Sequence, residues 1–211
     1  APKNNRVGYI ANKDGNSYVV INGKEYPGYD GACCLRFSLD GKHMAYIAQQ
    51  EGKQVVFQDE KPHKGHNAID RIIGLVFSPN SEHLAYVARK EDGSVVLVLD
   101  GRESRPYDAI KRVIFSPDGK QVACLATRQK NFYTLRNFQE IGPYDMVDSP
   151  TWSPNSQHLA FLAIKKDKWL IIKDDQELPA GNYDIMVQRT IVKPPWFFEG
   201  VKCFIFYLPP A

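Results

Sequence analysis

One phrase recurs along the chain at a nearly constant interval, and this repetition constrains the fold more than any other feature. Each clear copy starts with an aromatic residue and a serine, continues through a turn sequence such as Pro-Asp-Gly or Pro-Asn-Ser, and ends in an apolar run with two alanines. Successive copies lie about 40 residues apart, which is typical of arrays of small structural units. The copies start at Phe37, Phe77, Phe115 and Trp152, and a degraded fifth copy starts at Trp196.

The pattern inside each unit predicts β-strands. Short runs of β-branched and aromatic residues are separated by turn sequences, which favours about four antiparallel strands per unit. In the unit that follows Asp70 we expect strands over 72–78, 83–88 and 95–100, followed by a weak outer strand. A period near 40 residues with about four strands is typical of a β-propeller blade. We therefore predict an all-β fold, a small β-propeller of about five four-stranded blades that forms a single domain over residues 1–211.

The two ends of the chain bear on how the ring closes. Residues 6–30 match strands two to four of a unit without strand one, and residues 195–208 supply a strand one. Joining these N- and C-terminal strands would close the ring and remove exposed sheet edges. However, residues 7–11 and 203–208 both resemble strand two, so either one of them is surplus or the ring is open. An exposed apolar C-terminus would instead offer a surface for a homodimer.

The repeated phrase Phe-Ser-Pro-Asp-Gly-Lys, followed by an apolar run with Ala, resembles the repeat of TolB-like and WD-like bacterial β-propellers. The resemblance covers residues 6–207, which is nearly the whole chain. It implies the propeller fold and, by analogy with TolB-like proteins, a periplasmic or secreted location, although the cytoplasm stays open. It implies no single function.

Composition excludes several classes of function. The chain has 211 residues, with 27 Lys and Arg against 24 Asp and Glu, so its net charge is only +3. We expect no nucleic-acid partner, because such proteins carry a clustered basic face. No apolar run approaches the roughly 18 residues of a membrane span. Motifs for a nucleophile, a phosphate loop or a metal site are missing from the sequence, so we expect no enzyme, no cofactor and no metal.

Two sets of polar residues recur with the repeat. An aspartate precedes the anchor in every unit, and a residue that every blade carries usually serves the blade, here by accepting hydrogen bonds from turn backbone. The alternative is a rim of carboxylates that attracts cations. Three histidines share one later position, but equivalent positions on different blades are too far apart for a common metal ion. We interpret that position as the exposed start of a strand, where several residue types are tolerated. The Lys-rich stretch 61–66, with two further histidines, is interpreted as a solvated loop. The repeated aspartates are Asp30, Asp70, Asp108, Asp145 and Asp184. The three equivalent histidines are His43, His83 and His158, and the two histidines of the loop are His63 and His66.

The cysteines do not form a disulfide framework. Cys124 and Cys203 align with apolar positions of the second strand and are expected to be buried. Cys33 and Cys34 are neighbours on a predicted innermost strand, so we expect their side chains to lie on opposite faces.

Polar residues that break the repeat on the innermost strands are the candidate ligand-binding residues. A blade does not need them, because other units place Val, Leu, Ile, Gly or Ser at these positions. Together they would give the channel a mainly basic lining that can hold an anion or an acidic peptide; the alternative is a solvated channel with internal ion pairs. The residues are Arg36, Arg71, Lys111, Arg112 and Asp148.

These observations favour a non-enzymatic scaffold that binds a protein or peptide on one face of the ring. This hypothesis depends on the fold type and on missing catalytic motifs. One alternative is a carbohydrate or an anion bound at the channel mouth. A weaker alternative is a hydrolase or lyase that uses the aspartate rim.

Overall fold

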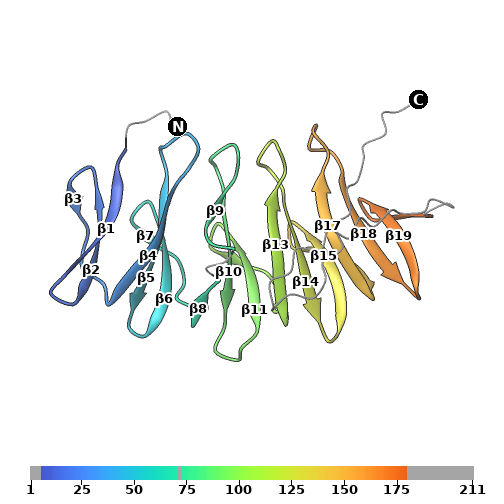
Figure 1. The fold of residues 1–211 in the computed structure, drawn as a ribbon, viewed down its shortest axis with the longest axis horizontal. Helices are drawn as coiled ribbons and strands as arrows, with labels where there is room; N and C mark the ends of the chain where they lie inside the picture. Colours follow the sequence, from blue (N-terminus) through green and yellow to red (C-terminus); the bar gives the residue numbers. More distant parts are fainter. Residues whose placement is uncertain (1–5, 71–72, 180–211) are drawn as a thin grey trace, which may run out of the picture.

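The structure is a computed structural model, and it describes residues 6–70 and 73–179. Every regular element in these residues is a β-strand, as predicted, and the strands form five antiparallel sheets that follow one another along the chain. Figure 1 shows the sheets standing side by side in chain order, from the first sheet in blue to the fifth in orange. No helix of the length and polarity needed to cross a membrane occurs in these residues.

The first two sheets differ by one strand. The first sheet has three strands, as expected for a segment that matches strands two to four of a unit. The second sheet has four strands, and its innermost strand pairs with the next one along the chain. The strands are β1 (Gly8–Lys13), β2 (Asn16–Ile21) and β3 (Lys24–Glu25), then β4 (Gly31–Phe37), β5 (Met44–Gln50), β6 (Lys53–Gln58) and β7 (Lys61–Pro62).

The third sheet has an innermost strand in two pieces. Both pieces pair with the same strand, β10 (Leu84–Arg89). The predicted strands over 83–88 and 95–100 are confirmed by β10 and β11, but the continuous strand predicted over 72–78 is wrong. Ile73 lies in a turn, Gly74 N donates to Asp70 O at 2.8 Å, and the described strand begins only at Val76. The strands are β8 (Ala68–Ile69), β9 (Val76–Phe77), β10 (Leu84–Arg89), β11 (Val95–Leu99) and β12 (Arg102–Glu103).

The fourth and fifth sheets each have four strands in simple up-and-down order. The first and fifth sheets lie at opposite ends of the row in Figure 1. The segment 195–208, on which the predicted ring closure depends, lies outside the described residues, and so do Trp196 and Cys203. The strands are β13 (Ala109–Phe115), β14 (Val122–Arg128), β15 (Asn131–Arg136) and β16 (Gln139–Tyr144), then β17 (Met146–Trp152), β18 (Leu159–Lys165), β19 (Lys168–Lys173) and β20 (Gln176–Pro179).

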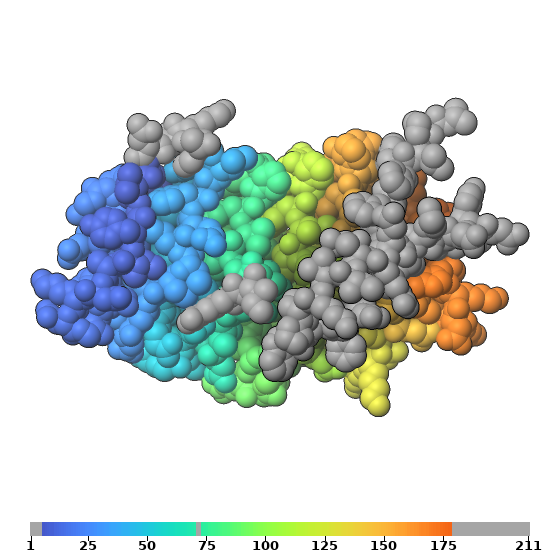
Figure 2. Space-filling view, in the orientation of Figure 1, coloured from blue at the N-terminus to red at the C-terminus, as the bar shows by residue number. Residues whose placement is uncertain are grey.

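The hydrophobic core is divided among the contacts between neighbouring sheets. Four clusters of buried side chains join the first sheet to the second, the second to the third, the third to the fourth and the fourth to the fifth. Figure 2 shows the same side-by-side packing in chain order. One position of the second strand is buried in all four complete sheets, with less than 2 % exposure. Its occupants are Tyr46, Tyr86, Cys124 and Phe161.

The repeated serine organises the turn after each innermost strand. Ser116, which is fully buried, donates from Oγ to Asp118 at 2.5 Å and accepts from Gln121 N at 3.0 Å. Ser38, Ser78 and Ser153 make the equivalent pairs of bonds. Some turns also reach the next sheet, since Asp118 N donates to Ser156 Oγ at 2.9 Å. The turn chemistry that recurs in these four sheets therefore explains the repeated phrase as a structural requirement of each sheet.

Candidate functional site

The innermost strands of the second, fourth and fifth sheets share a β-bulge three residues before the anchor. In β13 the register shifts between Lys111 and Ile114, and Arg112 adopts φ = 54°. The equivalent residues Cys34, Gly74 and Ser149 have φ values of 64°, 70° and 54°. A left-handed conformation costs a non-glycine residue roughly 1–2 kcal/mol, and a bulge redirects side chains. The bulge therefore changes where the repeat-breaking polar residues point.

The structure brings together two of the five predicted ligand-binding residues. Arg112 Nη2 lies 3.5 Å from Asp148 Oδ1, which joins the fourth sheet to the fifth. Lys111 and Arg112 are exposed, and Asp148 is half-buried. Arg36 is exposed on the second sheet, where its Nη1 donates to Leu35 O at 3.3 Å. Arg71 lies outside the described residues. A shared basic lining formed by all five residues stays a prediction.

Arg36 instead contributes to a second feature, a shallow hollow between the second and third sheets. We call it the apolar hollow. It has a volume of about 430 Å³ and contains Leu39, whose exposed fraction of 68 % is large for a leucine. The turns of the third, fourth and fifth sheets have Pro79, Pro117 and Pro154 where the turn of the second sheet, which we call the second unit, has Leu39. Its lining is Arg36, Phe37, Leu39, Leu75, Val76, Phe77, Ser78 and Pro79.

Sequence reasoning missed Leu39, although a signal was present. Like the polar candidates on the innermost strands, Leu39 breaks the repeat, and the blade does not need a residue that does so. Leucine does not provide the fixed φ of the proline that the other units have in this turn.

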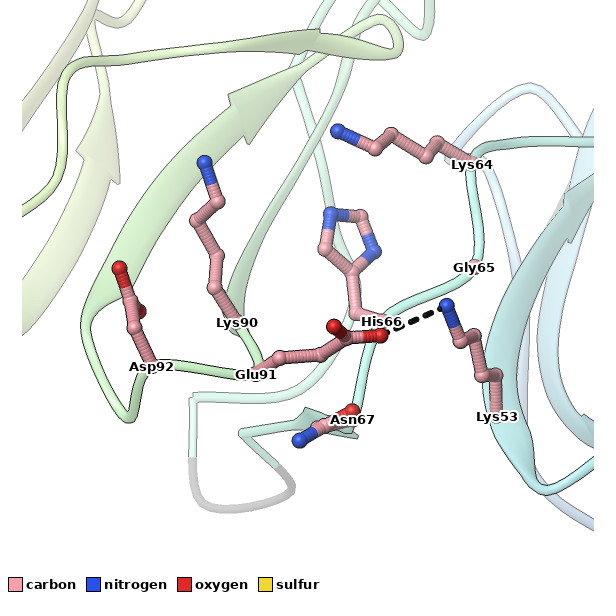
Figure 3. A pocket seen from close by; sticks show the side chains of 8 residues that line it. All are labelled: Lys53, Lys64, Gly65, His66, Asn67, Lys90, Glu91 and Asp92. Carbon is pink, nitrogen blue, oxygen red and sulfur yellow. Dashed lines mark ion pairs between the residues drawn. The ribbon is translucent and has the colours of Figure 1, made fainter.

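A polar pocket lies farther along the same inter-sheet boundary, and we call it the lysine pocket. Figure 3 shows Lys53 reaching across it to Glu91, with Nζ 3.0 Å from Oε1. Lys64 and Lys90 lie 2.9 Å and 3.7 Å from the Glu103 carboxylate. The pocket has a volume of about 350 Å³, and its lining is Lys53, Lys64, Gly65, His66, Asn67, Lys90, Glu91 and Asp92.

The interpretation of residues 61–66 as a solvated loop is wrong for its histidines. His66 is only 4 % exposed, and its Nε2 lies 3.3 Å from Glu103 Oε1. His63 Nδ1 lies 3.1 Å from Tyr86 Oη. Burial lowers the pKa of both imidazoles, and it outweighs the opposing effect of Glu103 on His66 and of Asp100 on His63. The loop packs against the third sheet, which places both rings beside Tyr86.

Three of the repeated aspartates accept hydrogen bonds from turn backbone. Asp108 Oδ2 accepts from Gln129 N at 2.8 Å, and Asp145 Oδ2 accepts from Lys166 N at 2.7 Å. Both donors lie in the hairpin turn between the second and third strands of the same sheet. Asp70 Oδ1 accepts from Ile73 N at 3.0 Å. The prediction of turn hydrogen bonds is confirmed for these three; Asp30 is exposed, and Asp184 lies outside the described residues.

The three equivalent histidines have a structural role at the start of the second strand, beyond the tolerated exposed position that was predicted. Each places Nδ1 beside the carboxylate of an aspartate at the end of the third strand, as His43 does with Asp59 at 2.6 Å. The other oxygen of Asp59 accepts from Met44 N at 2.9 Å, so the pair fixes the start of the second strand. His83 with Asp100 and His158 with Asp174 repeat this arrangement. Within residues 6–70 and 73–179, no three metal-ligating side chains gather at one point.

The bulge also overturns the expectation for Cys33 and Cys34. Alternation along a regular strand would place them on opposite faces, but Cys34 has φ = 64° and interrupts the alternation. Their sulfur atoms consequently lie 2.9 Å apart. Cys124 is fully buried, as predicted, and burial raises the pKa of its thiol.

Comparisons with known proteins concern the fold. The sequence matches no family model, and no curated protein matches it. Among solved structures, TolB from Acinetobacter baumannii is 16% identical, with a TM-score of 0.41, covering 82% of this chain and 50% of TolB. Acylaminoacyl peptidase from Pyrococcus horikoshii is 14% identical, with a TM-score of 0.44, covering 84% of this chain and 38% of the peptidase. The chain thus spans half or less of the length of these two proteins.

A third similar structure is an isolated propeller domain. The β-propeller domain of the Trilobed protease from Pyrococcus furiosus, which has an open velcro topology, is 10% identical to this chain. The TM-score is 0.41, and the match covers 82% of this chain and 65% of that domain. The likenesses to TolB and to this propeller domain agree with the TolB-like propeller type that the repeated phrase predicted. None of the three likenesses carries information on activity.

Proposed function

We propose that this chain is a propeller-type scaffold that holds an extended peptide segment of a protein partner in the apolar hollow. One observation carries the proposal: Arg36 and Leu39, which both break the repeat of the second unit, line the same hollow. Because the other units form their turns and innermost strands without these side chains, the blade itself does not require either of them.

The hollow has the chemistry of a peptide site. Leu39 is largely exposed beside Val76 and Phe77, which are half-buried, and covering a leucine fully stabilises a complex by about 1.5–3 kcal/mol. Arg36 adds an exposed cation at this apolar surface. A charge at the rim of an interface selects and orients its partner more than it strengthens binding. The partner segment is therefore apolar with an acidic residue at one end.

A peptide-display experiment on the full chain tests this proposal. Selected peptides should combine apolar side chains with Asp or Glu, and Leu39→Lys should weaken their binding at least about tenfold, or 1.4 kcal/mol. Leu178→Lys is the matched control, because Leu178 is also an exposed leucine, 40 % accessible, on the fifth sheet. Arg36→Glu should abolish the preference for acidic peptides. Equal losses in the two lysine variants would contradict the proposal.

The lysine pocket favours a second candidate function, the binding of a small polar ligand. Its lysine, carboxylate and amide groups supply both donors and acceptors around one concavity, as polar ligand sites do. Because each of its three lysines lies within ion-pair distance of a carboxylate, Glu91 or Glu103, a carbohydrate fits the pocket better than a simple anion. Thermal unfolding with a panel of sugars and anions tests this. At about 100 times its dissociation constant, a bound sugar should add roughly 2.7 kcal/mol of stability, and Asn67→Ala should abolish the effect. A saturable shift from an anion alone would contradict the carbohydrate assignment.

A further inference from the structure

We propose that Cys33 and Cys34 form a redox modification site, in which the two neighbouring thiols convert reversibly to a disulfide. The sulfur atoms already lie 2.9 Å apart. The S–S bond of a disulfide is about 2.05 Å long, so only a small approach separates the thiol pair from bond formation. This site is independent of the proposed peptide and ligand sites.

The backbone supplies the unusual proximity. In a regular strand, neighbouring side chains point to opposite faces, and neighbouring cysteines cannot meet. The register of β4 shifts between Cys33 and Arg36, and the left-handed φ of Cys34 turns the second side chain back toward the first. The same bulge occurs in the fourth and fifth sheets, with Arg112 or Ser149 at this position. Only the second unit places a cysteine there, next to another cysteine.

The thiols are accessible to a small reagent. Both cysteines are half-buried. Cys33 lines a hollow of about 210 Å³ between the first and second sheets, together with polar side chains that include Asn12, Gln49 and Gln54. A disulfide such as oxidised glutathione can therefore reach Cys33. Cys124 has no such access, because it is fully buried.

The exchange balances with oxidised glutathione as the oxidant. The Cys33 thiolate attacks one sulfur of the glutathione disulfide, which gives a mixed disulfide and releases one glutathione thiolate. The Cys34 thiolate then attacks the Cys33 sulfur and releases the second glutathione. The protein pair loses two electrons and two protons, and two glutathione thiols carry them away. Adjacent Cα atoms are about 3.8 Å apart, closer than in ordinary disulfides, so the product is strained and easily reduced.

Mass spectrometry of one tryptic peptide tests the proposal. Residues 25–36 lie between two trypsin sites and contain both cysteines of the pair and no others. The folded full chain is incubated with oxidised glutathione, blocked with an alkylating reagent and digested. We expect this peptide to lose two hydrogen atoms, and to regain them after treatment with dithiothreitol. Cys124→Ala should give the same result, because Cys124 takes no part.

The variant Cys34→Ser separates an internal disulfide from simple glutathione capture. Without the second thiol, the mixed disulfide cannot resolve, so peptide 25–36 should keep one glutathione. The wild-type result stands even if this variant fails to fold. The proposal would be overturned if the wild-type peptide carried two glutathiones. It would be overturned equally if both thiols stayed reduced in the folded chain while the urea-unfolded chain reacted.

Discussion

At the scale of single residues, the repeated serine shows how a hydroxyl group defines a turn. Ser116 satisfies the half-buried backbone N–H of Gln121 and orients Asp118. Ser116→Ala should destabilise the chain by about 1–3 kcal/mol, because Gln121 N–H loses its buried acceptor. Urea unfolding measures the change. Ser94→Ala is the control, since Ser94 bonds Asp92 in an exposed hairpin, and it should stay within about 0.5 kcal/mol of wild type. Equal effects would contradict this account of the turn.

His66 links one residue to the pH dependence of stability. Burial lowers the pKa of His66 in the folded chain, so the unfolded chain binds more protons. Stability is therefore complete above the unfolded pKa of about 6.5 and falls as the pH drops below it. His66→Gln should reduce the loss of stability between pH 7.5 and pH 5.5, measured by urea unfolding. His63 would supply the remaining loss, because burial lowers its pKa as well. An unchanged pH dependence in the variant would exclude this role for His66.

Sequence reasoning at this scale succeeded where a residue repeats and failed where packing decides. The turn role of Asp108 and Asp145 followed from their recurrence. The burial of His66 did not, because it depends on how a polar loop meets the next sheet, and a Lys-rich stretch carries no periodic signal of that contact. The proximity of Cys33 and Cys34 was also missed, since strand alternation fails at a bulge and a bulge at a non-glycine residue leaves no mark in the sequence.

At the scale of elements, the turns after the innermost strands determine how closely neighbouring sheets approach. Gly119 has φ = 77°, and a Cβ atom there would lie 2.3 Å from Asn80 Oδ1 on the previous sheet. That oxygen is held by Ser78 Oγ at 2.5 Å and cannot move aside freely. The contact explains why the fourth unit has Asp-Gly where the third has Asn-Ser.

Gly119→Ala tests this contact between elements. It should cost roughly 1–2 kcal/mol for the left-handed backbone and a further 1–3 kcal/mol for the clash. Gly93→Ala is the matched control, because Gly93 has φ = 83° and open space around its position, so only the backbone cost applies. Denaturant unfolding of both variants gives the difference. Equal costs would show that the third and fourth sheets do not meet closely at this turn.

At the scale of the whole molecule, each described sheet is held by its neighbours. About four strands per sheet could be predicted from the repeat period, and the three-stranded first sheet from the missing strand one, but the broken innermost strand of the third sheet could not. The apolar hollow could not be predicted from the sequence, because it arises where two sheets meet and Leu39 is its only residue that breaks the turn pattern. Since the four buried clusters each join adjacent sheets, stability should be distributed along the row as in other repeat arrays.

Hydrogen exchange in two core variants tests whether stability is distributed in this way. Tyr86 is fully buried between the second and third sheets, and Phe161 between the fourth and fifth. Each change to Ala removes about 3–5 kcal/mol from one cluster. Tyr86→Ala should accelerate amide exchange in β4–β12 and leave β17–β20 protected, whereas Phe161→Ala should reverse the pattern. If either variant accelerated exchange equally in all five sheets, the row would unfold as one cooperative unit, as expected when a ring closure couples its two ends.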